Sequence, residues 1–229
     1  MANADCGWLG IVAFLVWRGV PAGAQHPSPP TLVPLDATGR ITYFIAEGIE
    51  RSGHQPGDTE LAKWAFEEWA RGIGGALRFE ANADEGLSQI RLYWLPWAIA
   101  APGKLSLGET RPFRANGHSA ALISIRPNAA MMNEDTARRM RQDALLRDTM
   151  VYVTCLHEIG HALGLSDSDD DVNIMWGGGK QNLRVYQRYR QRLQTRASIV
   201  RASWLSNDDI ARAKALYSRP DEPRLQSVE

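Results

Sequence analysis

The chain has few cysteines, no excess of either charge and no apolar run long enough to span a membrane. Of its 229 residues two are cysteine, and the formal net charge is zero. Neutral balance gives no reason to expect nucleic acid or an anionic membrane as a partner. The apolar run 7–17 is too short to cross a bilayer unaided. With 44% hydrophobic and 23% charged residues, the composition suits one globular domain with a real core.

The first residues have the features of an export signal. The apolar run is followed by small residues at Ala22 and Ala24, which fit an A-x-A cleavage site. We therefore expect a signal peptide over 1–24 and a secreted, periplasmic or extracellular protein with no stable membrane insertion after cleavage. Cleavage would remove Cys6 and leave Cys155 alone, so the mature chain would have no internal disulfide.

The remaining domain limits follow from composition. Residues 25–40 are rich in proline and are predicted to form an extended leader. The catalytic domain is predicted over 41–218, and 219–229 form a charged, proline-containing tail. We expect a monomer.

His157, Glu158 and His161 form an HExxH pattern. On a helix, the four-residue spacing puts both imidazoles on one face, where they can hold a divalent metal, usually zinc. Glu158 lies at the flank of that face. It can reach a water at the metal without binding the metal itself, so it is the candidate general base of a zinc hydrolase.

A catalytic zinc site needs three protein ligands and one open position. Gly164 comes where the helix should stop, and glycine can adopt the left-handed conformation that turns the chain back. Asp167, three residues later, is then the candidate third ligand. One of the neighbouring carboxylates, Asp169 to Asp171, is the alternative, although such a run is more often a solvated loop or a Ca²⁺ contact.

Glutamate is missing where another class of zinc enzyme would need it. Those HExxH enzymes take a glutamate from a later helix as third ligand, but no glutamate lies between Ala162 and Asp221. The next one, Glu222, lies in the tail. This absence excludes that ligand arrangement.

The pattern HExxHxxGxx, followed by Asp167 and then Met175, resembles the metzincin metallopeptidases, and its spacing is similar to that of the matrixin branch. Aspartate as third ligand resembles the snapalysin-type enzymes. Gly177 departs from the matrixin pattern, which usually has proline there. The resemblance implies an α/β metzincin (zincin-like) fold: a twisted, mixed sheet with an active-site helix, a Met-containing turn and a C-terminal helix.

The local patterns agree with that architecture. Strands are predicted where β-branched and apolar residues alternate, namely at 41–45, 77–80, 90–95 and 119–125. A helix capped by Asp58 or Thr59 is predicted to reach Ile73, with Trp64 and Trp69 in the core. Ser206 can cap a last helix over 207–218.

Three further stretches carry predictions. Residues 131–148 are predicted to form an inserted amphipathic helix, with Asp148 or Thr149 capping the active-site helix that follows. In the matrixin fold a strand at the sheet edge binds substrate, and we place it within 104–113, inside the loop-rich stretch 96–116. The arginine-rich stretch 180–201 is predicted to pair with surface acids; the alternative is a docking patch for an acidic partner.

The sequence therefore predicts a secreted zinc endopeptidase acting on proteins or peptides. His157, His161 and Asp167 would hold Zn²⁺, and Glu158 would take a proton from the attacking water and pass it to the leaving amine. Two alternatives remain: a secreted metal-binding module without activity, or a zinc hydrolase with a non-protein substrate.

Overall fold

The computed structural model describes residues 32–217, apart from residues 38, 97–105, 129–132 and 180–182. The predicted signal peptide, residues 25–31 of the predicted leader and the tail lie outside this range. Among the residues that are described, no helix is long and apolar enough to cross a membrane.

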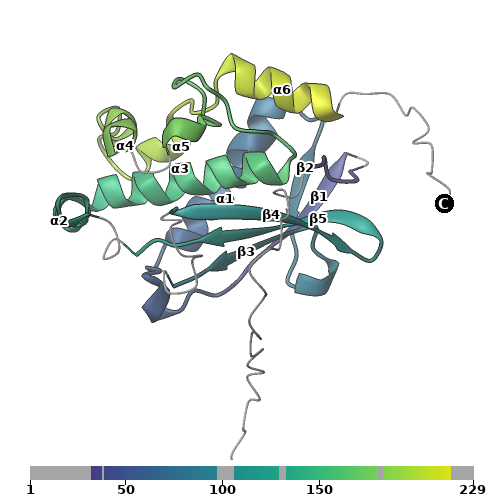
Figure 1. Cartoon of the computed structure of the whole chain (residues 1–229), viewed down its shortest axis with the longest axis horizontal. Coiled ribbons are helices and arrows are strands. Elements are labelled where there is room, and N and C mark those ends of the chain that lie inside the picture. Colours follow the sequence, from purple (N-terminus) through teal and green to yellow (C-terminus); the bar gives the residue numbers. More distant parts are fainter. Residues whose placement is uncertain (1–31, 38, 97–105, 129–132, 180–182, 218–229) are drawn as a thin grey trace, which may run out of the picture.

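Five strands form a mixed sheet in the order β2-β1-β3-β5-β4 (Figure 1). The first four run parallel to one another, and β4 pairs antiparallel with β5. The strands are β1 (Arg40–Ile45), β2 (Arg78–Ala81), β3 (Ile90–Trp94), β4 (Gly108–Ala115) and β5 (His118–Ile125). The four predicted strands are confirmed, with bounds shifted by no more than one residue.

The longest helix, α3, packs against β4 and β5 and also contacts α1, α2 and α4. Figure 1 shows α3 lying between the sheet and the later helices α4, α5 and α6. The helices are α1 (Asp58–Ile73), α2 (Glu134–Gln142), α3 (Ala144–Ala162), α4 (Leu183–Arg190), α5 (Ser198–Arg201) and α6 (Asn207–Tyr217). The α/β architecture with a closing helix is therefore present as predicted.

Aromatic side chains fill the core between α1, the sheet and α3. Trp69 is fully buried, and its indole N–H donates a 2.8 Å hydrogen bond to the Leu156 carbonyl of α3. Phe66 stacks on Tyr43 of β1, with ring centroids 4.0 Å apart. Trp64 is only half-buried, so the predicted core position holds fully for Trp69 alone. Together these contacts fix α3 over the sheet.

The start of α1 differs from the prediction, because Asp58 is the first helical residue and does not cap the helix. Its carboxylate is buried and forms a two-pronged ion pair with Arg147 of α3, with N–O distances of 2.6 and 2.7 Å. The same carboxylate accepts a hydrogen bond from the Gln55 N–H. Asp58 is thus drawn to a partner that is distant in sequence, and this pair joins the two main helices.

The predicted single helix over 131–148 is wrong. Two helices, α2 and α3, meet at Asp143, whose carboxylate caps α3 by accepting a 3.0 Å hydrogen bond from the Leu146 N–H. Asp148, the predicted cap, lies inside α3 and pairs with Arg196 at 2.6 Å. Residues 131 and 132 lie outside the described part of the chain.

The stretch predicted to be loop-rich contains β4, which forms a hairpin with β5. Asn116 and Gly117 have positive φ values of 52° and 82°, as a two-residue hairpin turn requires. Pro112 is tolerated because β4 ends the sheet, so its missing N–H leaves no ladder bond unmade. Of the predicted edge, 104–113, the structure describes residues 106–113, and β4 covers 108–113 of them.

The arginine-rich stretch pairs with acids, as predicted. Arg188 lies 3.2 Å from Asp171, and Arg190 lies 2.9 Å from Asp143. Apolar residues between the arginines, among them Tyr186, are buried against the core. These contacts give the stretch a packing role, and the docking-patch alternative gains no support from them.

Candidate metal centre

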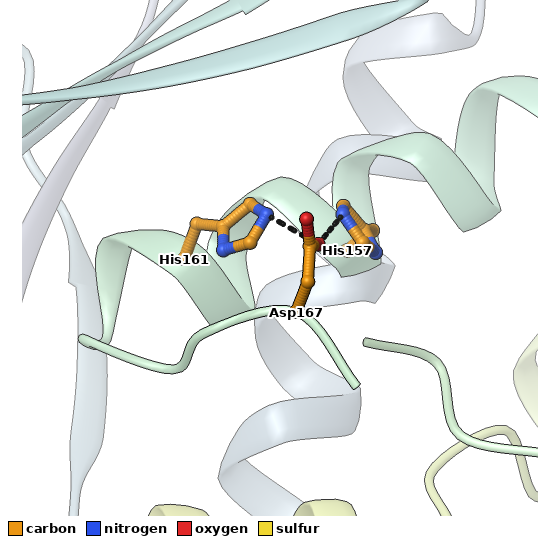
Figure 2. A group of neighbouring side chains, drawn as sticks. All are labelled: His157, His161 and Asp167. Carbon is orange, nitrogen blue, oxygen red and sulfur yellow. Dashed lines mark ion pairs between the residues drawn. The ribbon is translucent and has the colours of Figure 1, made fainter. Parts of the chain in front are cut away.

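The two predicted histidine ligands lie in the last turns of α3, and the chain turns back directly after them. Gly164 has φ +96°, the left-handed conformation predicted from its place in the sequence. The turn returns Asp167 to the helix, and Figure 2 shows its carboxylate reaching between the imidazoles of His157 and His161. The structure therefore brings the three predicted ligands together.

The distances within this group suit a tetrahedral metal. Oδ1 of Asp167 lies 3.4 Å from Nε2 of His157 and 3.3 Å from Nε2 of His161. Two ligands bound to zinc at about 2.0–2.1 Å on a tetrahedron are separated by about 3.3 Å. Both nitrogen–oxygen distances are thus close to the spacing that a shared ion would require, and the three ligand atoms lie within 4.8 Å of one another.

Backbone carbonyls fix the orientation of both rings. Nδ1 of His157 lies 2.8 Å from the Ile174 carbonyl, and Nδ1 of His161 lies 2.8 Å from the Leu165 carbonyl. Because a carbonyl oxygen only accepts, each Nδ1 must carry the proton, and in the neutral ring each Nε2 presents a lone pair. This is the outer hydrogen bonding typical of metal-binding histidines.

Nε2 of His157 is buried and has no hydrogen-bond partner in the described part of the chain. A buried polar atom without a partner is costly. Burial lowers the pKa of His157, but the Asp167 carboxylate and the charge of Glu158 raise it by more, so the net pKa lies above the ordinary value. The site therefore attracts positive charge at Nε2, and its residues fit a zinc ion.

The loop that carries Asp167 is joined to the Met-containing turn by backbone hydrogen bonds. The Ser168 N–H donates to the Met175 carbonyl at 2.7 Å, and the Gly177 N–H donates to the Ser168 carbonyl at 3.0 Å. A Cβ at Gly177 would lie 2.8 Å from Cβ and Cγ of Asp167. The glycine that departs from the matrixin pattern therefore leaves the space that the aspartate occupies.

The Met-containing turn is held in place by hydrogen bonds to Asp209 of α6. Met175 is fully buried and packs on Gly160 of α3. The Ile174 N–H donates to the buried carboxylate of Asp209 at 2.8 Å, and Ser206 donates to it as well. The sequence alone did not identify Asp209 as part of the centre, because an acid in the first turn of a helix is common for dipole reasons.

The alternative third ligands do not join the group. Among the residues that the structure describes, only one cluster of three potential ligands occurs, and it contains Asp167. Asp170 accepts a hydrogen bond from the Val172 N–H, and Asp171 pairs with Arg188. These contacts give partners to two of the three carboxylates in the acidic loop.

Glu158 is buried beside His157 and lines a cavity of about 40 Å³. The cavity lies between β4, α3, the Met-containing turn and α4, and its other lining residues are mainly apolar or aromatic, including Leu107, Ile174 and Tyr186. A cavity with an apolar lining next to the ligand group is a candidate binding pocket.

The comparisons with known proteins agree with this geometry. Residues 36–218 match the matrixin family, and no curated protein matches the chain. The match covers most of the 229 residues, including all of the ligand group. It confirms the predicted family and the predicted metzincin fold. The chain belongs to the matrixin family of zinc metallopeptidases.

Proposed function

We propose that the protein is a zinc-dependent endopeptidase that works outside the cytoplasm. The observation that carries the proposal is the convergence of three ligand atoms, two with their protonation fixed by backbone carbonyls, next to the buried Glu158. His157, His161 and Asp167 would hold the ion and leave a fourth position open. The action outside the cytoplasm is inferred from the sequence signal in residues 1–24.

Bound zinc would supply Lewis acidity, which acidifies water and polarises a peptide carbonyl. Glu158 would accept the proton of the attacking water and donate it to the leaving amine nitrogen. An extended peptide would add to the β4 edge by main-chain hydrogen bonds, with one apolar side chain entering the cavity beside Glu158. This docking would bring the scissile bond close to Glu158 and to the three residues that would hold the ion.

The test combines metal analysis with digestion of an unfolded protein such as casein. We expect the purified protein to bind about one zinc per chain and to cleave casein. Glu158→Ala should keep the zinc and lose activity by at least about 10²-fold. Glu67→Ala, which removes an exposed glutamate from α1, is the matched control and should change neither quantity.

Each of the other outcomes identifies an alternative. Zinc binding by a wild-type protein that cleaves no peptide would favour a binding module or a hydrolase with another substrate. Full activity in Glu158→Ala would remove the general base from the proposal. Loss of zinc in Glu158→Ala would instead place that carboxylate among the ligands.

A further inference from the structure

The side chain of Glu158 makes a hydrogen bond to the strand that crosses its helix. Oγ1 of Thr110, in the middle of β4, lies 2.7 Å from Oε2 of Glu158 and 2.9 Å from the backbone carbonyl of the same residue. A hydroxyl has one proton and can donate to only one of them at a time. A hydrogen bond to an ionised carboxylate is the stronger choice, so the proton belongs on Oε2 while Glu158 is charged.

Gly108, two residues earlier, lies on the same side of β4, because side chains alternate along a strand. A Cβ there would lie 2.5 Å from Cγ and 2.6 Å from Oε1 of Glu158. One oxygen of the carboxylate therefore packs on bare backbone at Gly108, and the other bonds to the hydroxyl of Thr110. The strand thus provides space for one carboxylate oxygen of Glu158 and a hydrogen-bond donor for the other, and both fit the same orientation of that side chain.

The burial of Glu158 makes this contact important. The residue is only 4% exposed. Thr110 is the only donor to its carboxylate in the part of the chain that the structure describes. A buried carboxylate that loses its donor also loses the interaction that holds its rotamer. A general base must lie within hydrogen-bond reach of the proton that it removes, so its rotamer decides whether it functions.

We propose that Thr110 is a positioning residue for the reaction: its hydroxyl holds the carboxylate of Glu158 in the orientation in which that carboxylate acts, and Gly108 provides the room for it. The inference rests on the proposed function of Glu158. It assigns to β4 a role in addition to docking substrate. The strand would place the base and the peptide relative to one another.

Thr110→Val tests the proposal, because valine keeps the shape and the β-branching and removes only the donor. We expect kcat to fall by about 10- to 100-fold, the usual consequence of losing a hydrogen bond to a charged group, with KM changed by less than about twofold. Thr110→Ser keeps the hydroxyl and should retain kcat within about threefold. Zinc affinity should stay at the wild-type value in both variants. The melting temperature of Thr110→Val should fall, because a buried acceptor loses its donor, so kcat is measured per mole of folded, zinc-loaded protein.

A second pair of variants shows whether Thr110 acts through Glu158. In a Glu158→Ala background, adding Thr110→Val should cause no further loss of the residual activity. A crystal structure of Thr110→Val should show the Glu158 carboxylate in another rotamer. Gly108→Ala should likewise displace the carboxylate and lower kcat.

The proposal fails if Thr110→Val keeps wild-type kcat, or if serine is as damaging as valine. It also fails if valine lowers activity only in proportion to a loss of zinc or of folded protein. These outcomes are separate from the failure of the proposed function, because that failure would appear as a wild-type protein that cleaves no peptide, or as full activity in Glu158→Ala.

Discussion

The backbone N–H of Ile174 donates a 2.8 Å hydrogen bond to the buried carboxylate of Asp209, and the carbonyl of Ile174 lies 2.8 Å from Nδ1 of His157. One residue of the Met-containing turn therefore links a side chain of α6 to a proposed zinc ligand. Three backbone N–H groups converge on Asp209, from Ile174, Met175 and Ser206, and the Ser206 hydroxyl lies 2.8 Å from the same carboxylate. An amide has only one accepting oxygen and cannot satisfy them all.

Asp209→Asn should therefore loosen the turn and misorient His157. We expect zinc affinity to fall by about 10- to 100-fold, as for other outer hydrogen-bond partners of metal ligands. The free energy of unfolding should fall by about 1–3 kcal/mol. Chelator competition and urea unfolding measure the two quantities. Glu67→Gln, at an exposed position of α1, is the control; equal zinc affinity in both variants would contradict the link.

Gly177→Ala should weaken zinc binding through Asp167. The added methyl would lie 2.8 Å from Cβ and Cγ of the aspartate, so the side chain must move away from the two imidazoles. We expect zinc affinity to fall by about tenfold or more. In an Asp167→Ala background the same change should have no effect on affinity, and a loss of equal size in both backgrounds would show that the methyl acts elsewhere.

Asp58→Ala should be among the most destabilising single changes in the domain. It removes the two-pronged partner of the buried Arg147, whose next carboxylate, Asp148, is 3.7 Å away, and breaking such a buried pair costs about 3–5 kcal/mol. The exposed pair of Asp135 and Arg138 provides the comparison, since Asp135→Ala should cost less than about 1 kcal/mol. Urea unfolding of the metal-free proteins measures both. Similar losses would mean that the buried pair contributes little.

The folding stability of the metal-free protein should depend on pH because of His157. Burial lowers the pKa of this residue, but Asp167 and Glu158 raise it more, so the folded value lies above 6.5. A raised folded pKa stabilises the fold below the unfolded pKa, and this contribution disappears as the pH rises through the folded pKa.

The stability difference between the wild type and Asp167→Asn, both without metal, should therefore be larger near about pH 6 than near about pH 8. Melting temperatures over that range measure it. A difference that does not change with pH would show that Asp167 does not interact with a protonated His157.

The ligand group could be predicted from sequence because its parts are local. His157 and His161 are one helical turn apart. Gly164 ends the helix in a left-handed backbone conformation, which depends on that residue alone and not on a distant partner. Asp167 follows within reach of that turn. The strands could also be predicted from sequence, because the alternation of apolar and polar residues within a short segment indicates a strand.

Two features escaped prediction because a partner lies far along the chain. Asp58 was predicted to be a cap from its position, but Arg147, 89 residues later, recruits its carboxylate. Thr110 was part of a predicted edge strand, yet nothing in its neighbourhood indicates that Glu158 lies across from it. The Asn116-Gly117 pair was a local signal for the hairpin, and the loop prediction overlooked it.

The place of Asp209 near the end of the domain has a consequence for biosynthesis. A chain leaves the ribosome from its N-terminus, so the two imidazoles emerge before α6 has been made. Until then the Ile174 N–H lacks its Asp209 acceptor. The Ile174 carbonyl, which orients His157, therefore belongs to a turn that α6 does not yet hold in place. The nascent chain thus completes its metal-binding geometry last, after the rest of the sheet and α3 have been synthesised.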